Sequence, residues 1–555
     1  MQYKGAEILM ECLLEQDVSD IFGYPGGAVL PIYDALYKYK DKITHYLTAH
    51  EQGAAHAADG YARATGRVGV CLATSGPGAT NLVTGIATAY MDSQPLVAIT
   101  GNVPLPLLGK DSFQEVDITG ITMPITKHNF IVKDVKDLAD IVRKAFYIAK
   151  SGRPGAVLID IPRDVQIAET DFSNRPLRAI RSDTRRLTTQ SINDAVKMLG
   201  EAQRPLLYSG GGVITADAAE ELTQLSEKID APVCISAMGK GGMPASHESF
   251  VGMIGMHGTA TANTLATECD LLVAIGARFS DRVVSNVQRF APNAKVLHID
   301  IDAAEINKNV LTAHSVVGDV KSALFHIIDA LAKKNNAKWI KRMRELKKQF
   351  PLTYDSKDGV LRPQYIIERI NALAKDAIIT TEVGQHQMWA CQYIETEKPR
   401  QFISSGGLGT MGFGLGAAIG AAVGTGKTVI NIAGDGCFRM NSIELATAVE
   451  YNVPVIEIIL NNHALGMVRQ WQTMFFDKRY SHTSLHTKTT DFIKLAEAYQ
   501  AAAFNVTKPE EVDNAIKEAL ALKKPVLINC ELGADDKVFP MVPPGRGIDE
   551  FVLGE

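Results

Sequence analysis

The feature that most constrains the fold is a regular alternation of short apolar runs with helical patterns along the whole chain. Each run is four to seven residues long and is followed by a turn and a helix-like segment. Continuous apolar runs without a polar face are typical of parallel strands that are buried on both sides. We therefore expect an α/β protein built from doubly wound parallel sheets. The runs are 68–74, 96–100, 156–161, 205–208, 271–275, 295–299, 429–433 and 455–460.

Two polar stretches divide the 555 residues. Residues 165–190 show no periodicity, and residues 333–362 combine a charged helical pattern, which carries one apolar stripe, with a loop. A chain of this length has room for three or four domains. We therefore predict three domains, at 1–165, 188–335 and 360–545.

The first and third predicted domains resemble each other. Ala87-Thr-Ala precedes Pro95 by the same spacing as Ala446-Thr-Ala precedes Pro454, and the two copies lie 359 residues apart. Each copy also follows a strand and a Gly-x-Gly turn. The shared context favours two related domains that flank a different one.

Composition excludes several classes of protein. The net charge is −5, which gives no electrostatic footprint for nucleic acid or for an anionic membrane. None of the seven cysteines belongs to a C-x-x-C pair, so neither a disulfide framework nor a zinc site is indicated. No apolar stretch reaches the length of a membrane span, and the start has no secretory pattern. A reducing cytoplasm is the expected location.

Three patterns imitate well-known motifs. Residues 407–412 satisfy G-x-G-x-x-G, 424–428 resemble the end of a P-loop, and His50-Glu51 with His56 misses the spacing of zinc proteases. The first pattern leaves open a NAD-type oxidoreductase, which needs an acidic ribose partner about 20 residues further on. Asp435 lies near that offset, but a metal explains it better.

The stronger signal joins two turns. Gly434-Asp435-Gly436 follows the run 429–433, and Asn461-Asn462 follows the run 455–460 after an interval of 24 residues. The carboxyl ends of parallel strands are where such sheets bind ligands. One carboxylate, one side-chain amide and backbone carbonyls are ligands that suit Mg²⁺, which commonly shares its shell with phosphate oxygens. The alternative is two unrelated turns.

The stretch from Gly434 to Asn462 resembles the diphosphate-binding motif of the thiamin-diphosphate (ThDP) enzymes. By this resemblance Asp435, Asn462 and the carbonyl of Ala464 ligate Mg²⁺, beside the glycines Gly434 and Gly436. These enzymes have homologous pyrimidine-binding and diphosphate-binding domains, in that order. The resemblance therefore assigns the first role to the first domain and the second role to the third.

The ThDP enzymes also need a carboxyl group beside the cofactor's pyrimidine ring, shielded from water so that it shares a proton near neutral pH. Glu51 fits, because it opens a helix of small residues after the strand-like segment 44–47. The alternative is an ordinary carboxylate at a helix N-terminus. By resemblance, Met411 wedges between the two cofactor rings, and the carbonyl of Gly409 accepts a hydrogen bond from the 4′-amino group.

Within the ThDP enzymes the chain resembles, nearly end to end, the catalytic large subunit of acetohydroxyacid synthase, also called acetolactate synthase. Jointly the matching segments are specific, although each alone is weak. They are Phe22-Gly-Tyr-Pro-Gly-Gly-Ala28, Phe113-Gln-Glu-Val-Asp117, Ile125-Thr-Lys-His-Asn-Phe130, Gly152-Arg-Pro-Gly155, Gly255-Met-His-Gly258, Gly276-Ala-Arg-Phe279, Val383-Gly-Gln-His-Gln-Met-Trp389, Met467-Val-Arg-Gln-Trp471 and Lys478-Arg-Tyr-Ser-His482.

The resemblance implies a ThDP-dependent transferase. It decarboxylates pyruvate and condenses the hydroxyethyl unit, held on the cofactor, with a second 2-keto acid. A second pyruvate gives 2-acetolactate, and 2-ketobutyrate gives 2-aceto-2-hydroxybutyrate, at the first common step of branched-chain amino acid biosynthesis. The alternative is a related pyruvate decarboxylase or oxidase that uses FAD in a redox step.

The resemblance also assigns the substrate site. Arg282 binds the carboxylate of the second substrate as a planar, permanently charged fork. Trp471 walls the pocket, with Met467 on the same segment. The amide of Gly27 is an oxyanion donor. Gln114 and Lys127 line the site. For Trp471 alone, a core aromatic residue is the alternative.

By the same resemblance the middle domain binds FAD, which is structural because the expected reaction has no net redox change. Gly210, Gly211 and Gly212 follow a strand, where bare amides meet a pyrophosphate. The other flavin contacts carried over are Arg153, His257, Arg278, Asp300 and Asp319.

The cofactor is expected between two subunits, with Glu51 from one and Asp435 from the other, so that the active unit is a homodimer or homotetramer. The resemblance allows a regulatory small subunit as a further partner. The sequence departs from the family at Asn102, where Gln is usual, at Ser280, where Asp is usual, and in the tail around Gly545. These departures affect the rim of the pocket and not the reaction class.

Overall fold

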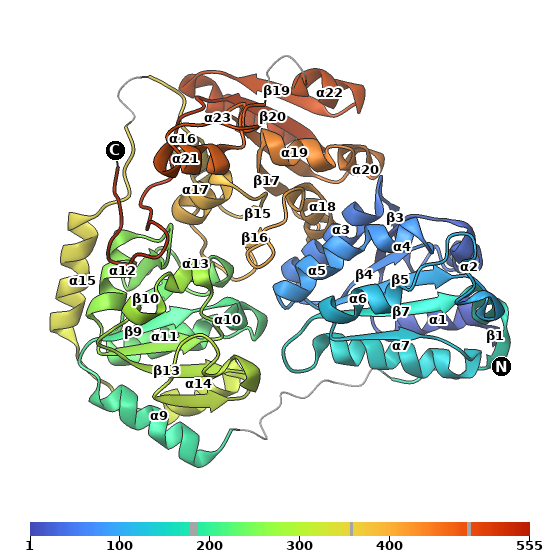
Figure 1. Cartoon of the computed structure of the whole chain (residues 1–555), viewed down its shortest axis with the longest axis horizontal. Coiled ribbons are helices and arrows are strands. Elements are labelled where there is room, and N and C mark those ends of the chain that lie inside the picture. The colour runs from blue at the N-terminus through green and yellow to red at the C-terminus, as the bar shows by residue number, and fades with distance from the viewer. Residues whose placement is uncertain (177–186, 356–358, 486–489, 555) are drawn as a thin grey trace.

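The computed structural model describes residues 1–176, 187–355, 359–485 and 490–554. It contains three α/β domains, each with a six-stranded parallel sheet covered by helices (Figure 1). The fold class and the three doubly wound sheets predicted from the sequence are thus confirmed. The predicted linker at 165–190 includes the end of α8 and all of β8, while 177–186 lie outside the described residues. Residues 356–358 of the second predicted loop also lie outside them.

The first sheet has the strand order β3-β2-β4-β5-β7-β6. Its strands are apolar because helices pack on both faces, and β4, β5 and β7 are buried at every position. A separate antiparallel pair, β1 and β8, ties the N-terminus to the end of the domain. The elements are β1 Gln2–Lys4, α1 Gly5–Glu15, β2 Asp20–Gly23, α2 Leu30–Lys38, β3 Thr44–Leu47, α3 Glu51–Thr65, β4 Gly69–Ala73, α4 Pro77–Asn81, α5 Val83–Met91, β5 Leu96–Asn102, α6 Ile118–Thr122, β6 His128–Ile131, α7 Val135–Lys150, β7 Ala156–Pro162, α8 Arg163–Ile167 and β8 Glu169–Asp171.

The middle sheet has a different order, β11-β10-β9-β12-β13-β14. Numbered from its own first strand, this is 3-2-1-4-5-6, the order of dinucleotide-binding folds, whose ligands lie where the order reverses. The reversal lies between β9 and β12. The elements are α9 Thr189–Glu201, β9 Pro205–Ser209, α10 Gly211–Thr215, α11 Ala219–Ile229, β10 Val233–Ile235, β11 Phe250–Met253, α12 Ala260–Glu268, β12 Leu271–Ile275, α13 Asp281–Val284, β13 Lys295–Asp300, β14 His314–Val317, α14 Val320–Ala330 and α15 Ala337–Gln349.

The third sheet repeats the topology of the first, with the order β16-β15-β17-β18-β20-β19. Numbered from their own first strands, both sheets read 2-1-3-4-6-5, so the similarity seen in the sequence extends to the whole fold. The elements are α16 Pro363–Leu373, β15 Ile378–Thr381, α17 Gln385–Tyr393, β16 Phe402–Ser404, α18 Gly414–Thr425, β17 Val429–Gly434, α19 Asp435–Asn441, α20 Glu444–Glu450, β18 Val455–Asn461, α21 Gly466–Phe475, α22 Phe492–Ala498, β19 Ala502–Val506, α23 Pro509–Leu522 and β20 Val526–Glu531.

The first and third domains meet through helices α3 and α18, which lie side by side in Figure 1. Both helices are rich in Ala and Gly, which allows their backbones to approach closely. A Cβ atom on Gly420 would overlap the carbonyl oxygen of Ala57, so this crossing requires glycine.

The end of the chain returns to the middle domain, as the dark red trace in Figure 1 shows. The amide of Val542 donates to the carbonyl of Met256 at 2.8 Å, and Ser285 donates to the carbonyl of Arg546 at 2.9 Å. Among the described residues, no helix combines the length and the apolar character that crossing a membrane requires.

Candidate active site

The Gly-Asp-Gly and Asn-Asn motifs meet at one edge of the third sheet. Strands β17 and β18 are neighbours in parallel register, with Gly434 opposite Leu460, so the turns that follow them lie side by side. They line a small pocket of about 80 Å³. The sequence prediction placed both motifs at this edge, and the structure brings Asp435, Asn462 and Ala464 together there.

Asp435 is the most unusual group in this pocket. Its side chain is buried, and neither carboxylate oxygen has a hydrogen-bond partner among the described residues. Desolvation raises the pKa of Asp435 to about 6. A buried carboxylate without partners is costly unless a cation neutralises it.

The other donors around Asp435 are neutral oxygens. Asn462 uses its amide to donate to Gln385 at 3.2 Å, and its Oδ1 accepts from the amide of Ala464. No described part of the chain gathers three or more His, Cys, Asp or Glu side chains in a metal-binding arrangement. One carboxylate with amide and carbonyl oxygens suits Mg²⁺, which keeps phosphate oxygens and waters in its shell, rather than a cage made only of protein ligands.

Met411 lines the same pocket from a turn between β16 and α18. Gly409 and Gly412 flank it with φ angles of +70° and +87°, values that favour glycine. The sequence reasoning missed Glu382, which holds this turn: its carboxylate accepts from the amides of Gly412 at 2.7 Å and Gly414 at 2.8 Å. Burial raises the pKa of Glu382 to about 7. The only sequence feature that could have indicated Glu382 is its position, as an acidic residue directly after an apolar strand.

Glu51 lies at the first position of α3, as predicted, and is 9% exposed. Its Oε2 accepts from the amide of Asn81 at 2.9 Å, and His50 caps the helix by accepting from the amide of Gln52. Glu51 does not share the pocket of Asp435, because every described lining residue of that pocket lies between Val383 and Val468. Within one chain, Glu51 and Asp435 therefore do not line a common pocket.

The remaining predicted residues of the first domain are spread over three loops. Gly27 opens a short turn after β2, and Gln114, with φ +58°, packs its backbone against Gly76. Lys127 donates to the carbonyls of Ile148 and Ser151 at the end of α7, at 2.5 and 2.6 Å. Burial lowers the pKa of Lys127 to about 8. The ammonium group is therefore already engaged within the chain.

A larger cavity, of about 420 Å³, lies at the reversal of the middle sheet. All three domains contribute to it: Ser93 and Arg153 come from the first, the middle sheet supplies most of the wall, and Gly406 comes from the third. Seven of the eight predicted flavin contacts line it, namely Arg153, Gly210, Gly211, Gly212, Arg278, Asp300 and Asp319.

The eighth predicted contact, His257, does not line this cavity. It is buried beside the third domain, where Gln392 donates to its carbonyl, and burial lowers the pKa of its imidazole to about 4.

The structure also changes the expected role of Gly210 and Gly212. The amides of Gly210 and Gly212 already donate to the carbonyls of Ile275 and Gly276. A Cβ atom on Gly210 would overlap the Gly276 oxygen, so close packing against the end of β12 explains this glycine.

The predicted substrate residues lie on two elements. Met467 and Trp471 are four residues apart on α21, and Met467 lines the pocket of Asp435. Trp471 packs edge-to-face on Phe475 with ring centroids 5.4 Å apart. Arg282 belongs to α13 of the middle domain and lines the larger cavity; its side chain is 66% exposed. The guanidinium of Arg282 lies 3.8 Å from the carboxylate of Asp281 and donates to the sulfur of Met256. Of the two α21 residues, Met467 lines the small pocket and Trp471 does not.

Of the three sequence departures, Asn102 has a clear structural place. Its amide donates to Asp160 at 2.6 Å, and Thr100 donates to the other oxygen of Asp160 at 2.7 Å. Burial nevertheless raises the pKa of Asp160 to about 7. Ser280 caps α13 by accepting from the amide of Arg282.

Comparison with known proteins gives three consecutive family matches. Residues 3–121 match the thiamine pyrophosphate enzyme N-terminal TPP binding domain, 192–327 the central domain, and 382–530 the C-terminal TPP binding domain. Curated relatives match nearly end to end. A probable acetolactate synthase large subunit of Methanocaldococcus jannaschii is 48% identical, covering 99% of this chain and 95% of that protein. The acetolactate synthase large subunits of Mycobacterium tuberculosis and Cyanidium caldarium are 48% and 45% identical over 99% of this chain, and 91% and 96% of those proteins are covered.

Proposed function

Because the chain belongs to the acetolactate synthase large-subunit family of thiamine pyrophosphate enzymes, we propose that it joins two 2-keto acids with loss of CO₂. It takes a two-carbon unit from pyruvate and transfers it to a second pyruvate, giving 2-acetolactate, or to 2-ketobutyrate, giving 2-aceto-2-hydroxybutyrate. The observation that carries the proposal is the unpartnered, buried Asp435 at the shared edge of β17 and β18, within a chain that matches all three TPP-enzyme domains.

The third domain holds the diphosphate end of the cofactor. Asp435, Asn462 and the carbonyl of Ala464 bind Mg²⁺, and the positive charge removes the desolvation cost of the unpartnered carboxylate. Gly434 and Gly436 border the same pocket without side chains that would fill it. When bound, ThDP supplies a carbon nucleophile and an electron sink for the decarboxylation.

Glu51 holds a proton at N1′ of the cofactor's pyrimidine. Its burial and its hydrogen bond from the neutral amide of Asn81 suit this role. Since Glu51 does not line the pocket of Asp435, a second copy of the chain supplies it, and the active unit is at least a homodimer. Large apolar side chains are exposed on the first and third domains, as expected for a surface that a second copy of the chain covers. They are Phe113 and Met123 on the first domain and Met440 and Val468 on the third.

The substrate residues divide the remaining work. Arg282 binds the carboxylate of the second 2-keto acid through its exposed guanidinium. Gly27 offers its amide to the developing negative charge. Gln114 contacts the substrate from its loop, and Met411, beside Gly409, fixes the conformation of the cofactor. Met467 and Trp471 form the apolar wall. Lys127, tied to two carbonyls, acts by positioning the loop between α6 and β6.

FAD fits the larger cavity. The strand order of the middle sheet is the one used for dinucleotides, and the cavity combines Arg153 and Arg278 for phosphate with Asp300 and Asp319 for hydroxyl groups. His257 does not line this cavity, so its proposed contact with the flavin requires a rearrangement of the residues around it. Because the proposed reaction has no net redox change, the flavin's role is structural.

We also propose the domain limits 1–165, 188–335 and 360–545.

The proposal is tested with purified protein, Mg²⁺, ThDP, FAD and pyruvate, without any electron acceptor. Acetolactate should form, and the flavin spectrum should stay oxidised. Acetate with peroxide, or acetaldehyde as the main product, would instead identify an oxidase or a decarboxylase.

Trp471→Leu should lower the preference for 2-ketobutyrate over pyruvate by about tenfold, because one methylene against an apolar wall is worth about 1–3 kcal/mol. The measurement is the ratio of the two products when both substrates compete. Phe476→Leu is the matched control, since Phe476 directly follows the same helix but is 52% exposed. An unchanged ratio in the Trp471 variant would remove this residue from the pocket wall.

Partners and location complete the proposal. The relatives are named large subunits, which agrees with a regulatory small subunit as a further partner. All seven cysteines are free and buried, which agrees with a reducing cytoplasm.

A further inference from the structure

One short stretch of chain borders both the large cavity and the small pocket. This bridging segment, residues 404–412, runs from the end of β16 towards α18. Gly406 lines the large cavity and Met411 lines the pocket of Asp435, five residues further on. A change in the position of the bridging segment would therefore alter the lining of both the large cavity and the small pocket.

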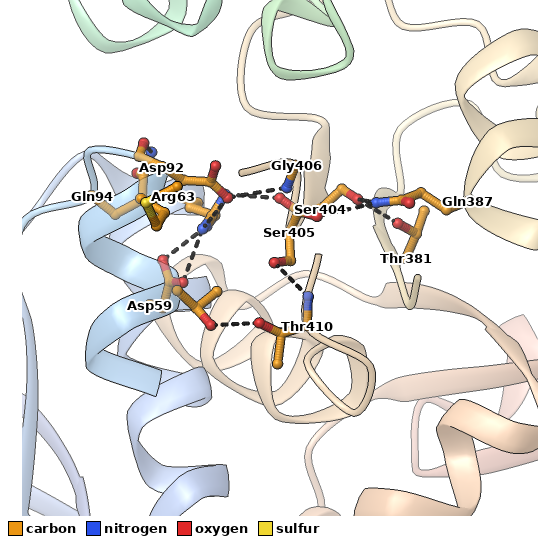
Figure 2. Close-up of polar contacts among 12 residues, drawn as sticks. Asp59, Arg63, Asp92, Gln94, Thr381, Gln387, Ser404, Ser405, Gly406 and Thr410 are labelled. Atoms are coloured by element: carbon orange, nitrogen blue, oxygen red, sulfur yellow. Dashed lines mark hydrogen bonds and ion pairs between the residues drawn. The ribbon is translucent and has the colours of Figure 1, made fainter. Parts of the chain in front are cut away.

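The first domain holds the start of the bridging segment through a buried cluster of charges (Figure 2). Arg63 donates to Asp59 at 2.8 Å, to Asp92 at 3.1 Å and to the carbonyl of Ser404 at 2.9 Å. Asp92 in turn accepts from the amide of Gly406 at 3.1 Å. The guanidinium and the Asp92 carboxylate thus fix two neighbouring points of the segment.

A second contact holds the far end of the bridging segment. The hydroxyls of Thr88, on α5, and Thr410 are 2.7 Å apart. The amide of Thr410 donates to the hydroxyl of Ser405 at 3.0 Å (Figure 2). Thr410 lies between Gly409 and Met411, the two residues proposed to touch ThDP. The segment is therefore fastened to the first domain on both sides of Gly407. The contacts come from α3, which also packs on α18 of the third domain, and from α5 and the residue that follows it.

Two carboxylates form ion pairs with one guanidinium in this cluster, and the guanidinium of Arg278 lies near Asp92, beside Gly407. The side chains of Asp59 and Asp92 are 0% exposed and that of Arg63 is 5% exposed, so two carboxylates share one guanidinium. The Oδ1 atom of Asp92 has no hydrogen-bond partner among the described residues, although Asp92 lines the large cavity. An unpaired buried carboxylate oxygen is costly, and a ligand that donates to it lowers that cost.

We propose that Asp92 is a positioning residue that couples the occupant of the large cavity to ThDP binding by fixing the bridging segment. The inference rests on the proposed flavin and ThDP sites. A dinucleotide packed against Asp92 and Gly406 restrains the same groups that hold the segment, so less conformational entropy remains to be lost when ThDP orders Gly409 and Met411. By linkage, ThDP tightens flavin binding by the same factor.

The test is the ThDP dissociation constant, measured by titration at saturating Mg²⁺ with and without FAD. In the unmodified chain FAD should tighten ThDP binding by about fivefold or more. In Asp92→Asn, which keeps the shape of the side chain but loses its charge, the factor should fall to about one. Asp217→Asn is the matched control: it also removes the carboxylate of an Arg–Asp pair, with Arg400 at 3.3 Å, but it is 70% exposed and does not touch the bridging segment.

The outcomes are distinguishable. If FAD tightens ThDP binding in the Asp92→Asn chain as much as in the unmodified chain, the coupling does not run through Asp92. FAD that binds the unmodified chain but leaves ThDP affinity unchanged overturns the coupling while the flavin site stands. An unmodified chain that binds no FAD overturns the proposed flavin site itself, and the coupling with it. If Asp92→Asn does not fold, Thr88→Val tests the second contact. It should reduce the factor while leaving FAD affinity measured without ThDP unchanged, and a full factor there contradicts the proposal.

Discussion

Glu51→Gln is expected to lower acetolactate formation from pyruvate by about 10³-fold while leaving ThDP and Mg²⁺ affinity within about threefold of the unmodified chain. The substitution keeps the size of the side chain and an oxygen for the contact with Asn81. It removes only the ability to hold a shared proton at the pyrimidine. The measurement pairs a turnover assay with a ThDP titration.

A matched control is available on α1. Glu7 is also a carboxylate in the first turn of a helix, but it pairs with Lys38 at 2.8 Å, at the surface and outside every proposed site. Glu7→Gln should keep normal turnover. Normal turnover in Glu51→Gln as well would assign Glu51 to the helix terminus and not to catalysis.

Asp435→Asn is expected to weaken Mg²⁺-dependent ThDP binding by 100-fold or more, because it removes the single carboxylate of the proposed metal site. Chelation of Mg²⁺ should produce the same loss in the unmodified chain. Returned Mg²⁺ should restore binding there but not in the variant. Equal ThDP affinity with and without Mg²⁺ in the unmodified chain would contradict the assignment.

The same substitution should have the opposite effect on the stability of the chain without cofactors. Burial raises the folded-state pKa of Asp435 to about 6 from the ordinary value of 3.8, so the folded chain binds a proton that the unfolded chain releases. The stability contribution of the group therefore falls as the pH rises from about 4 to about 6 and stays low above that. At pH 8 the Asp435→Asn chain should melt at a temperature equal to or above that of the unmodified chain, and at pH 5 this advantage should shrink. Thermal melting at the two pH values is the measurement.

Local patterns predicted much of the fold and of the diphosphate site. Apolar runs mark strands wherever both faces of a sheet are covered, and strand ends that are neighbours in a parallel sheet bring their turns together. That rule was enough to place Asp435 beside Asn462. The repeated Ala-Thr-Ala and Gly-x-Gly context predicted two related outer domains, whose sheets share the strand order 2-1-3-4-6-5.

Contacts between distant segments could not be predicted in this way. Arg63 and Ser404 are 341 residues apart, and Glu382 holds the Met411 turn from another loop. The first pair forms when two domains pack, and the second forms when two loops of the third domain meet. In neither case does a sequence pattern identify the partner. The same reason explains His257, whose place depends on how the end of the chain lies on the middle domain, and the amides of Gly210 and Gly212, which bond to a neighbouring strand end instead of facing the cavity.

The central claim is that one acetolactate-forming site combines Glu51 of one copy with Asp435 of another. The most direct measurement is acetolactate formation by chains carrying Glu51→Gln and Asp435→Asn, produced together in equal amounts. In a randomly assorted dimer, half of the molecules contain one of each, and each of these keeps one intact site. The account therefore predicts about one quarter of the unmodified activity. Activity no higher than that of the two variants measured separately would contradict it.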